Sequence, residues 1–201
     1  MPALCDRRYM AKPLFDHFGL LAPLYERFIQ PKTPEKLCAL IDCPPEGLIL
    51  DAGGGTGRVA QFLSTHANRV IIADESHKML RQAGSKGTLE PVCSLTESLP
   101  FANGFFDRII MVDALHHVDH QQQTALELWR VLKPGGKIVI EEPDIRRLAV
   151  KLIALGEKLA LMRTHFLSPK RIAVLFGTLN ASTNIDMDGH IAWVIVKKPI
   201  P

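Results

Sequence analysis

The chain has 201 residues, of which 47% are hydrophobic and 22% are charged. This composition excludes an intrinsically disordered chain, and the length fits one globular domain that buries most of its apolar surface. The formal net charge of +3 argues against a strongly basic protein that binds nucleic acid through a cationic surface.

Cysteine spacing and hydropathy exclude two further classes. The four cysteines form no Cys-X-X-Cys pair, so we expect no structural zinc site and no bound metal. No stretch of 18 uncharged apolar residues predicts a transmembrane helix, and the N-terminus lacks the apolar segment of a secretory signal. We therefore expect a cytoplasmic protein with reduced thiols.

Residues 1–47 differ in composition from the rest of the chain, because they contain seven of the 14 prolines. Proline ends helices, so this region predicts short helices, over about 14–30 and 34–42. We interpret residues 1–47 as a helical lid and residues 48–201 as the main domain.

From residue 48 onward, short apolar runs alternate with helical segments. The expected strands are 48–50, 70–73, a weak one at 90–94, 108–112, 137–141, and a terminal hairpin of 184–187 and 191–197. The expected helices are 57–66, 76–83 with Ser76 as N-cap, 122–132 ended by Pro134-Gly135-Gly136, 145–163 and 169–177. Buried runs of this kind indicate an α/β fold with a mostly parallel sheet covered on both faces. The hairpin around Asp188-Gly189 is expected to be antiparallel.

A glycine-rich turn follows the first strand, with the sequence Asp51-Ala-Gly53-Gly54-Gly55-Thr56-Gly57. Glycines allow a tight turn and let a ligand lie against bare backbone at the N-terminus of a helix. The dinucleotide fingerprint places glycines first, third and sixth, but the sixth position counted from Gly53 is Arg58. The spacing therefore favours a ligand with an amino-acid moiety, whose ammonium group Asp51 can approach.

Asp74 ends the second strand, 21 residues after Gly53. A carboxylate at this place in a doubly wound fold can accept hydrogen bonds from both ribose hydroxyls of a nucleoside. The alternative is that Asp51 and Asp74 only cap strand ends. The glycine turn beside them favours the binding role.

Four segments in this order resemble class I S-adenosylmethionine-dependent methyltransferases, in the small-molecule branch that includes the ubiquinone/menaquinone biosynthesis C-methyltransferases. They are LILDAGGGTG (48–57), IIADESHKML (71–80), LPFANGFFDRIIMV (99–112) and LWRVLKPGGKIVIE (128–141). The resemblance covers about residues 48–142. It implies a Rossmann-like doubly wound sheet of seven strands in the order 3-2-1-4-5-7-6, with the last strand antiparallel. It also implies S-adenosylmethionine as cofactor, S-adenosylhomocysteine as product and a small-molecule methyl acceptor.

The resemblance also implies which residues bind the cofactor. The expected contacts are Asp51, Gly53, Gly54, Gly55 and Gly57 around the methionine part, Asp74 on the ribose, Glu75 and Met79 beside the adenosine, Ser94 and Leu95 beside the adenine, Asp113 near the sulfonium, and Tyr25 over the cofactor. Leu95 departs from the family pattern, which has an acid there that accepts from the adenine amino group. Losing such a hydrogen bond costs about 0.5–1.5 kcal/mol, unless another group compensates.

Methyl transfer from a sulfonium needs no acid to assist the leaving group, so positioning alone can supply much of the catalysis. Where an acceptor must lose a proton, His116 is the favoured candidate base, with His117 orienting it. Both histidines can equally be structural. Glu141, Glu142 and His165 are weaker candidates on the acceptor side.

Several alternatives stay open at this stage. The chain could bind S-adenosylmethionine without catalysis, as a regulatory protein or a subunit, or it could be an NAD-dependent oxidoreductase. Methylation of nucleic-acid amino groups is disfavoured, because Asp113-Ala-Leu-His stands where those enzymes carry Asn/Asp-Pro-Pro-aromatic. The basic helix expected over 145–163 either packs on the sheet or contacts a membrane surface, and we expect packing. A homodimer partner could complete the acceptor pocket.

Overall fold

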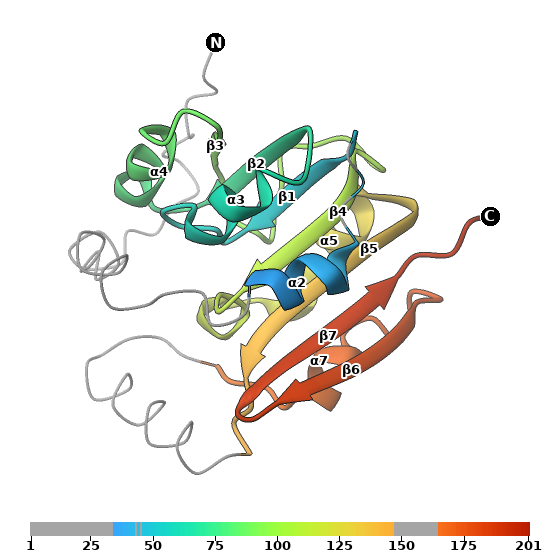
Figure 1. Cartoon of the computed structure of the whole chain (residues 1–201). Coiled ribbons are helices and arrows are strands. Elements are labelled where there is room, and N and C mark those ends of the chain that lie inside the picture. Colours follow the sequence, from blue (N-terminus) through green and yellow to red (C-terminus); the bar gives the residue numbers. More distant parts are fainter. Residues whose placement is uncertain (1–33, 43, 45, 147–164) are drawn as a thin grey trace.

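A computed structural model describes the chain except for residues 1–33, 43, 45 and 147–164 (Figure 1). The helix expected over 14–30, Tyr25 and nearly all of the helix expected over 145–163 lie outside the described residues. The proposed lid boundary at residue 47 is likewise untested. Helix α2 (Pro34–Ile41), which belongs to the expected lid, packs on the sheet through buried Leu37 and Ile41.

Seven strands form one sheet at the centre of the molecule (Figure 1). In chain order they are β1 (Leu48–Ala52), β2 (Arg69–Asp74), β3 (Glu90–Cys93), β4 (Phe106–Val112), β5 (Leu132–Pro143), β6 (Ser182–Asp188) and β7 (Ile191–Lys197). Their spatial order is β3-β2-β1-β4-β5-β7-β6, and β7 runs antiparallel to both its neighbours. The expected order, the parallel pairing of the first five strands and the terminal hairpin are therefore confirmed.

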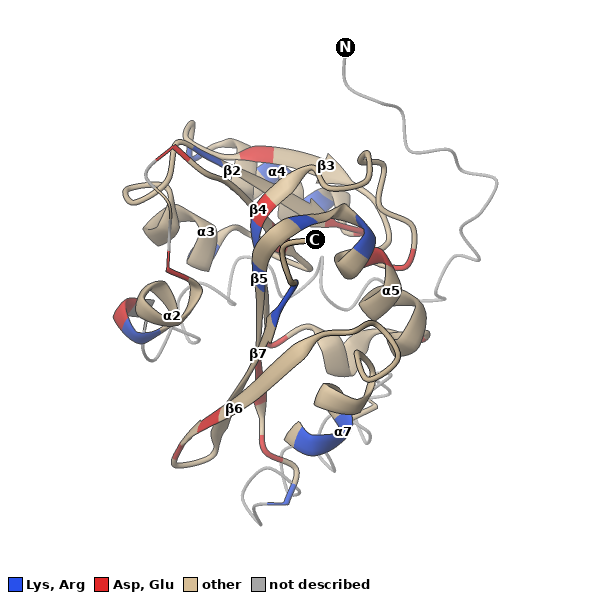
Figure 2. Ribbon diagram, turned by 90° about the vertical axis from the view of Figure 1, so that its right-hand side faces the viewer, with Lys and Arg blue, Asp and Glu red and all other residues tan. Residues whose placement is uncertain are grey.

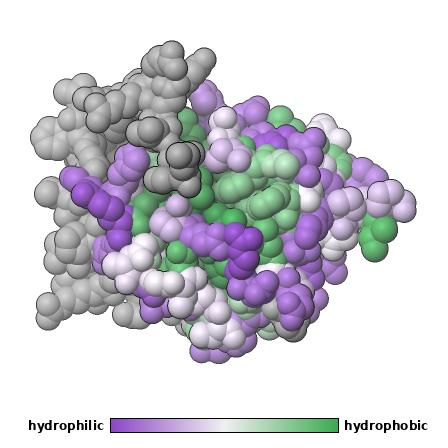
Figure 3. Space-filling model, turned by 90° about the horizontal axis from the view of Figure 1, so that it is seen from above, coloured by the Kyte–Doolittle hydropathy of each residue, from purple (hydrophilic) through white to green (hydrophobic). Residues whose placement is uncertain are grey.

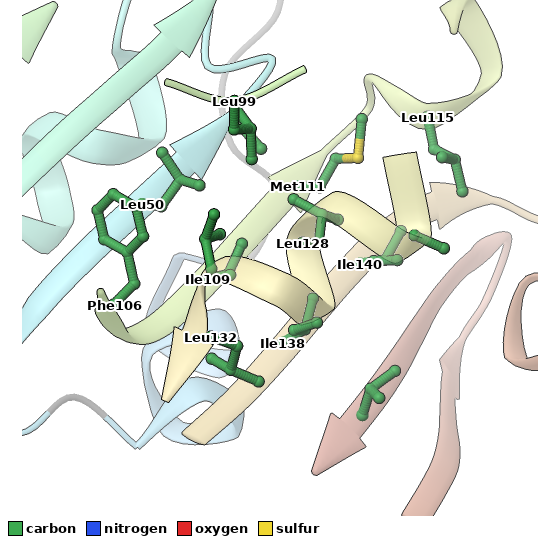
Figure 4. Packing of buried hydrophobic residues seen from close by; sticks show 14 of the residues in the cluster. Leu50, Leu99, Phe106, Ile109, Met111, Leu115, Leu128, Leu132, Ile138 and Ile140 are labelled. Atoms are coloured by element: carbon green, nitrogen blue, oxygen red, sulfur yellow. The ribbon is translucent and has the colours of Figure 1, made fainter. Parts of the chain in front are cut away.

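Helices cover both faces of the sheet, as the apolar strands required (Figure 2). Helices α2, α3 (Arg58–Leu63) and α4 (His77–Gly84) lie on one face, where they bury side chains such as Leu63 and Leu80. Helices α5 (Gln121–Val131) and α7 (Pro169–Val174) cover the other face with Leu128 and Ile172, in the cluster drawn in Figure 4. The short 3-10 helix η1 (Leu115–His117) joins β4 to α5.

Helix boundaries follow local side chains. Ser76 caps α4 as expected, since its Oγ accepts from the backbone N–H of Met79 at 3.4 Å. Helix α3 is shorter than the expected 57–66. The hydroxyls of Ser64 and Thr65 donate to the carbonyls of Gln61 and Phe62, and such bonds compete with helix continuation.

The expectation that Pro134-Gly135-Gly136 ends a helix is wrong. Helix α5 already ends at Val131, and β5 begins at Leu132, five residues before the expected strand. Leu132 pairs with Phe106 and Lys137 pairs with Arg108, so the residues between them bulge out of β5. Gly135 has a φ of 74° in this bulge, and its N–H donates to Lys198 O at 3.0 Å. The tripeptide therefore shapes an edge of the sheet rather than a helix end.

The surface carries apolar and polar areas. Seen from above, hydrophobic residues gather near the middle of the visible face, and hydrophilic residues surround them (Figure 3). Among the helices that the structure describes, none combines the length and the apolar character needed to span a bilayer.

Candidate functional site

The residues expected to bind the cofactor meet at the carboxyl ends of β1, β2, β3 and β4. The glycine turn after β1 begins where Gly53 donates its N–H to Ala73 O of β2 at 2.7 Å. Gly53, Gly55 and Gly57 all have positive φ, and Gly57 is the N-cap of α3. The turn therefore lies at the topological switch point, between strands that lead to opposite halves of the sheet, where doubly wound folds bind ligands.

Gly55 and Gly53 are two of the positions in this turn where a side chain does not fit. Gly55 has a φ of 54°, and a Cβ there would lie 3.0 Å from Met79 Sδ. Gly53 has a φ of 71°, and a Cβ there would lie 2.7 Å from the Cβ of Ala114. A side chain at either position would meet both backbone strain and a steric clash. The turn is thus packed against α4 on one side and against the loop after β4 on the other.

Asp74 holds the glycine turn and the start of α4 together. Its Oδ2 accepts from the backbone N–H of Gly55 at 2.9 Å, and its Oδ1 accepts from the N–H of Ser76 at 2.8 Å. A carboxylate oxygen can accept more than one hydrogen bond. A carboxylate at this strand end is of the type that suits two hydroxyl donors on neighbouring carbon atoms.

Asp51 is buried beneath the turn with only 1% of its surface exposed. Its Oδ2 has no hydrogen-bond partner in the part of the chain that the structure describes. Burial raises the pKa of this carboxyl from 3.8 to about 7, with Arg58 lowering it and Asp74 raising it further. A buried carboxyl oxygen without a donor is costly, and a ligand ammonium group would remove that cost.

Ser94 presents a second buried polar atom without a partner. Its backbone N–H donates to Asp74 O at 3.0 Å, which fixes the residue just after β3, but its Oγ has no hydrogen-bond partner among the described residues. Leu95 beside it is half-buried, Met79 is buried, and Glu75 is exposed. The resulting surface combines apolar side chains with one hydroxyl that is available to a ligand.

The loop after β4 forms the other side of the site. Asp113 has a φ of 54°, which is unusual for a residue with a side chain, and its N–H donates to Glu141 O at 2.9 Å. Glu141 is half-buried near the carboxyl end of β5, and its Oε2 accepts from Trp193 Nε1 at 2.7 Å. Burial raises the pKa of Glu141, and the nearby charge of Asp113 raises it further while Arg58 lowers it. Two acids therefore flank the end of β4.

Sequence reasoning missed the role of Glu142. It is 4% exposed, and its carboxylate accepts from the N–H groups of Ala114 and Leu115 and contacts His116 Nδ1 at 2.6 Å. His116 was the favoured catalytic candidate, but its ring is only 3% exposed and stacks on Phe166 at 4.2 Å. The observed contacts of His116 are those of a residue that holds its neighbours. No local sequence signal pairs a β5 acid with a histidine after β4.

The other acceptor-side candidates lie farther out. His117 is half-buried, and its ring lies 4.0 Å from that of His116. His165 is exposed, and its Nε2 lies 3.8 Å from Asp119 Oδ1. Within residues 34–42, 44, 46–146 and 165–201, no three His, Cys, Asp or Glu side chains gather as a metal site would require.

Comparison with known proteins agrees with this geometry. Residues 50–140 match the family described as "Methyltransferase domain". The ubiquinone/menaquinone biosynthesis C-methyltransferase UbiE of Vibrio cholerae is 35% identical over 115 residues, which cover 51% of this chain and 44% of that protein. The enzyme of the same name from Ralstonia nicotianae is 33% identical over 102 residues, which cover 47% of this chain and 42% of that protein. The chain thus matches less than half the length of these relatives.

Solved structures share the fold at low sequence identity. A SAM-dependent methyltransferase from Thermotoga maritima superposes with a TM-score of 0.75 at 20% identity, covering 90% of this chain and 98% of that one. The [4+2]-cyclase SpnF also superposes with a TM-score of 0.75, at 13% identity, covering 92% and 94% of the two chains. The presence of a cyclase among these neighbours shows that the fold alone does not define the reaction.

The expected resemblance to class I S-adenosylmethionine-dependent methyltransferases is therefore confirmed in sequence over residues 50–140, and the solved structures confirm the fold. S-adenosylmethionine is the cofactor that this resemblance implies. The residues present fit this group. The unpartnered oxygen of Asp51 suits an ammonium, the carboxylate of Asp74 suits a pair of hydroxyls, and the unpartnered Oγ of Ser94 suits a nitrogen or amino group of a base.

Proposed function

We propose that this chain, whose residues 50–140 match the methyltransferase domain family, transfers a methyl group from S-adenosylmethionine to a small-molecule acceptor. The observation that carries the proposal is a pair of buried polar atoms without hydrogen-bond partners among the described residues, Asp51 Oδ2 beneath the glycine turn and Ser94 Oγ just after β3. Buried polar atoms in folded proteins are almost always hydrogen-bonded. Two exceptions at the carboxyl edge of one sheet support a polar ligand that completes them.

In this proposal the chain binds the cofactor along the carboxyl edge of the sheet. Asp51 and the turn from Gly53 to Gly57 face the methionine part, with Gly54 packed over the Asp51 carboxyl. Asp74 accepts from the ribose hydroxyls. Glu75, Met79, Ser94 and Leu95 surround the adenosine, and Asp113 lies near the sulfonium. The acids at this edge also favour a ligand that carries positive charge.

Methyl transfer from a sulfonium depends more on the positioning of the acceptor than on proton transfer. When bound, S-adenosylmethionine would supply a methyl group on a positively charged sulfur, and that sulfur would leave as a neutral thioether without needing a proton. The acceptor atom must then lie in line with the methyl–sulfur bond, and holding that alignment accounts for much of the rate. For an acceptor that must lose a proton, Glu141 near the carboxyl end of β5 is a candidate base, because burial raises its pKa and so strengthens its affinity for a proton.

A small-molecule acceptor is supported by two observations. The curated relatives are described as acting in ubiquinone and menaquinone biosynthesis, and this chain resembles their shared core. The loop Asp113-Ala-Leu-His also differs from the sequence of enzymes that methylate amino groups of nucleic acids. The proposal does not fix whether the acceptor atom is carbon, oxygen or nitrogen.

The remaining expectations belong to the same proposal. Of the expected lid over residues 1–47, the part that precedes α2 would cover the cofactor, with Tyr25 over it, because α2 itself is attached near the amino end of the sheet. The main domain would begin at residue 48. The proposal requires neither a membrane contact through residues 145–163 nor a homodimer. Sedimentation equilibrium tests the dimer, and co-flotation of the chain with anionic vesicles tests the membrane contact.

A binding and turnover experiment tests the function. We expect calorimetry to detect S-adenosylmethionine and S-adenosylhomocysteine but not NAD, and S-adenosylhomocysteine to form with at least one member of a panel of phenols, amines and activated carbon acids. Tight binding without turnover on any acceptor would favour a non-catalytic binding protein. Stabilisation by NAD alone would overturn the proposal.

A further inference from the structure

Glu142 accepts hydrogen bonds from three consecutive residues of the loop after β4. Its Oε1 accepts from Ala114 N at 3.1 Å and from Leu115 N at 2.7 Å, and its Oε2 lies 2.6 Å from His116 Nδ1. The side chain is 4% exposed, so this carboxylate is held by protein donors rather than by solvent. Removing it would leave two buried backbone N–H groups without an acceptor, which is a large local penalty.

This clamp fixes the loop where it meets the candidate cofactor site. Ala114 lies so close to the glycine turn that a Cβ on Gly53 would stand 2.7 Å from its own Cβ. Asp113, next to it, adopts a φ of 54°, which is uncommon for a residue with a side chain. Glu142 accepts from the two residues that directly follow Asp113. It therefore controls the position of both Asp113 and the wall of the glycine turn.

The other half of the clamp reaches a segment far away in sequence. The ring of His116 stacks on Phe166 with a centroid distance of 4.2 Å and an angle of 11°. The carbonyl of His116 accepts from the N–H of His165 at 2.6 Å. Gln121 adds a third link, because its Nε2 donates to both Leu115 O and His165 O. The chain that returns at residue 165 is thus attached to the same loop.

The contact with Glu142 also sets the state of the His116 ring. A carboxylate at 2.6 Å requires a proton on Nδ1, and this fixes both the tautomer and the ring plane that Phe166 packs against. A buried pair of this kind is weak support for stability as such, since an apolar pair of similar size often does as well. Its distinctive property is geometric, because it holds two distant segments in one arrangement.

We propose that Glu142 is a positioning residue that couples the cofactor-binding loop at Asp113–Ala114 to the acceptor-side segment at His165–Phe166, with His116 as the link. The inference rests on the proposed function, since it assumes that a cofactor occupies the carboxyl edge. It assigns His116 to positioning in place of proton transfer. Because coupling between two sites is reciprocal, cofactor binding tightens the attachment of His165, and loosening that attachment weakens the response to the cofactor.

Hydrogen exchange at the His165 amide, with and without S-adenosylhomocysteine, reads this coupling directly. In the wild type we expect saturating S-adenosylhomocysteine to slow exchange at His165 by about fivefold or more. Glu142→Gln keeps an acceptor oxygen for Ala114 and Leu115 but replaces the carboxylate that faces His116. We expect it to keep the affinity for S-adenosylhomocysteine within about threefold, to speed basal exchange at His165, and to lose the slowing by ligand.

His116→Phe provides a second test in case Glu142→Gln does not fold, and Asp107→Asn provides the control. His116→Phe keeps a ring against Phe166 without Nδ1, and it should also lose the slowing at His165 while binding the ligand. The matched control is Asp107→Asn, at the opposite end of the sheet, where the carboxylate likewise accepts from a backbone N–H, that of Leu48. It should lower the melting temperature and leave both the affinity and the ligand-dependent exchange unchanged.

The outcomes separate the inference from the function on which it rests. If the wild type binds no S-adenosylhomocysteine, the proposed function fails. If it binds the ligand and His165 exchange is slowed equally in the wild type, Glu142→Gln and His116→Phe, the coupling is refuted and Glu142 is only structural. Loss of the slowing in Asp107→Asn as well would also refute it, since any destabilisation would then have the same effect.

Discussion

The two ends of the central sheet differ in whether their polar side chains have hydrogen-bond partners within the described residues. At the amino end, Asp107 accepts from the N–H of Leu48 at 3.0 Å and from Lys133 Nζ at 2.8 Å. Arg108 and Lys137 there donate to backbone carbonyls of α2 at 2.8 and 2.9 Å. At the carboxyl end, the buried atoms Asp51 Oδ2 and Ser94 Oγ have no hydrogen-bond partner in the described part of the chain.

The difference shows which end folding completes by itself. The same strands supply both ends, so composition of the sheet does not explain the contrast. Ionic and backbone contacts satisfy the amino end and attach α2 to the sheet. The carboxyl end keeps the cost of unsatisfied buried groups, as functional sites commonly do. A bound ligand would supply hydrogen-bond partners at the carboxyl end, as the protein itself does at the amino end.

Among the substitutions at the carboxyl end, replacing Asp74 should lower the affinity for the cofactor most strongly. Asp74→Ala removes charge-assisted hydrogen bonds worth about 1.5–3 kcal/mol, so we expect affinity for S-adenosylmethionine to fall between about tenfold and a hundredfold. Titration calorimetry measures the change. Asp107→Asn, at the amino end, is the control and should leave the affinity unchanged. Equal affinities of Asp74→Ala and the wild type would contradict the ribose contact.

The second largest expected effect is the pH dependence of stability and of cofactor affinity that the ionisation of Asp51 causes. Its folded pKa of about 7 lies above the unfolded value of 3.8, so the folded apo protein binds the extra proton. The contribution of Asp51 to stability is therefore complete below pH 3.8 and is lost as the pH rises through about 7. A ligand ammonium favours the ionised carboxylate, so affinity for S-adenosylmethionine should rise about tenfold from pH 6 to pH 8.

Asp51→Asn tests the source of this pH dependence. The amide does not ionise, so the variant should be more stable than the wild-type apo protein at pH 8, by up to roughly 2–4 kcal/mol. Its affinity for the cofactor should be lower and nearly independent of pH between 6 and 8. Chemical denaturation and calorimetry at the two pH values give both quantities. A wild-type affinity that stays flat over this range would argue against a contact between Asp51 and the ammonium.

Ser94→Ala separates ligand binding from folding at the adenine side. The hydroxyl has no hydrogen-bond partner among the residues that the structure describes, so its removal should leave the melting temperature unchanged or slightly raised. Loss of one hydrogen bond to the ligand should weaken S-adenosylhomocysteine binding between about twofold and tenfold. Thermal melts with and without ligand measure the two effects. A lower apo melting temperature with unchanged affinity would assign the hydroxyl to the fold instead.

Leu95→Asp should give the smallest change, and in the opposite direction. The new carboxylate would restore the acid that the resembled family carries, and it should tighten S-adenosylhomocysteine binding about twofold to fivefold. The gain is limited because Asp74 and Glu75 already place negative charge near this position. Leu95→Asn supplies a neutral acceptor as the matched control. Weaker binding by both variants would indicate that adenine recognition depends on an apolar residue 95.

Much of the site followed from residues close together in sequence. Asp51, the glycine turn and Asp74 were predicted because a strand, a turn and a helix start are local patterns, and the structure brings them together with Met79 and Ser94. The contacts of Glu142 were not predicted, because Glu142 in β5 and His116 in η1 are 26 residues apart. The structure buries His116 against Glu142 and Phe166, and its role as a base stays a prediction.

The sequence by itself determined the strands, their parallel pairing and the final hairpin, because apolar runs, turn residues and helix caps act within a few residues. It placed the start of β5 five residues too late, since the conformation of Pro134-Gly135-Gly136 is decided by the pairing of β5 with β4 and by the contact with Lys198. Only the tertiary structure decided which polar groups are satisfied. Strand register sets which face each side chain occupies, and a shift of one residue would reverse it. The unpartnered oxygen of Asp51 and the clamp of Glu142 are consequences of that register.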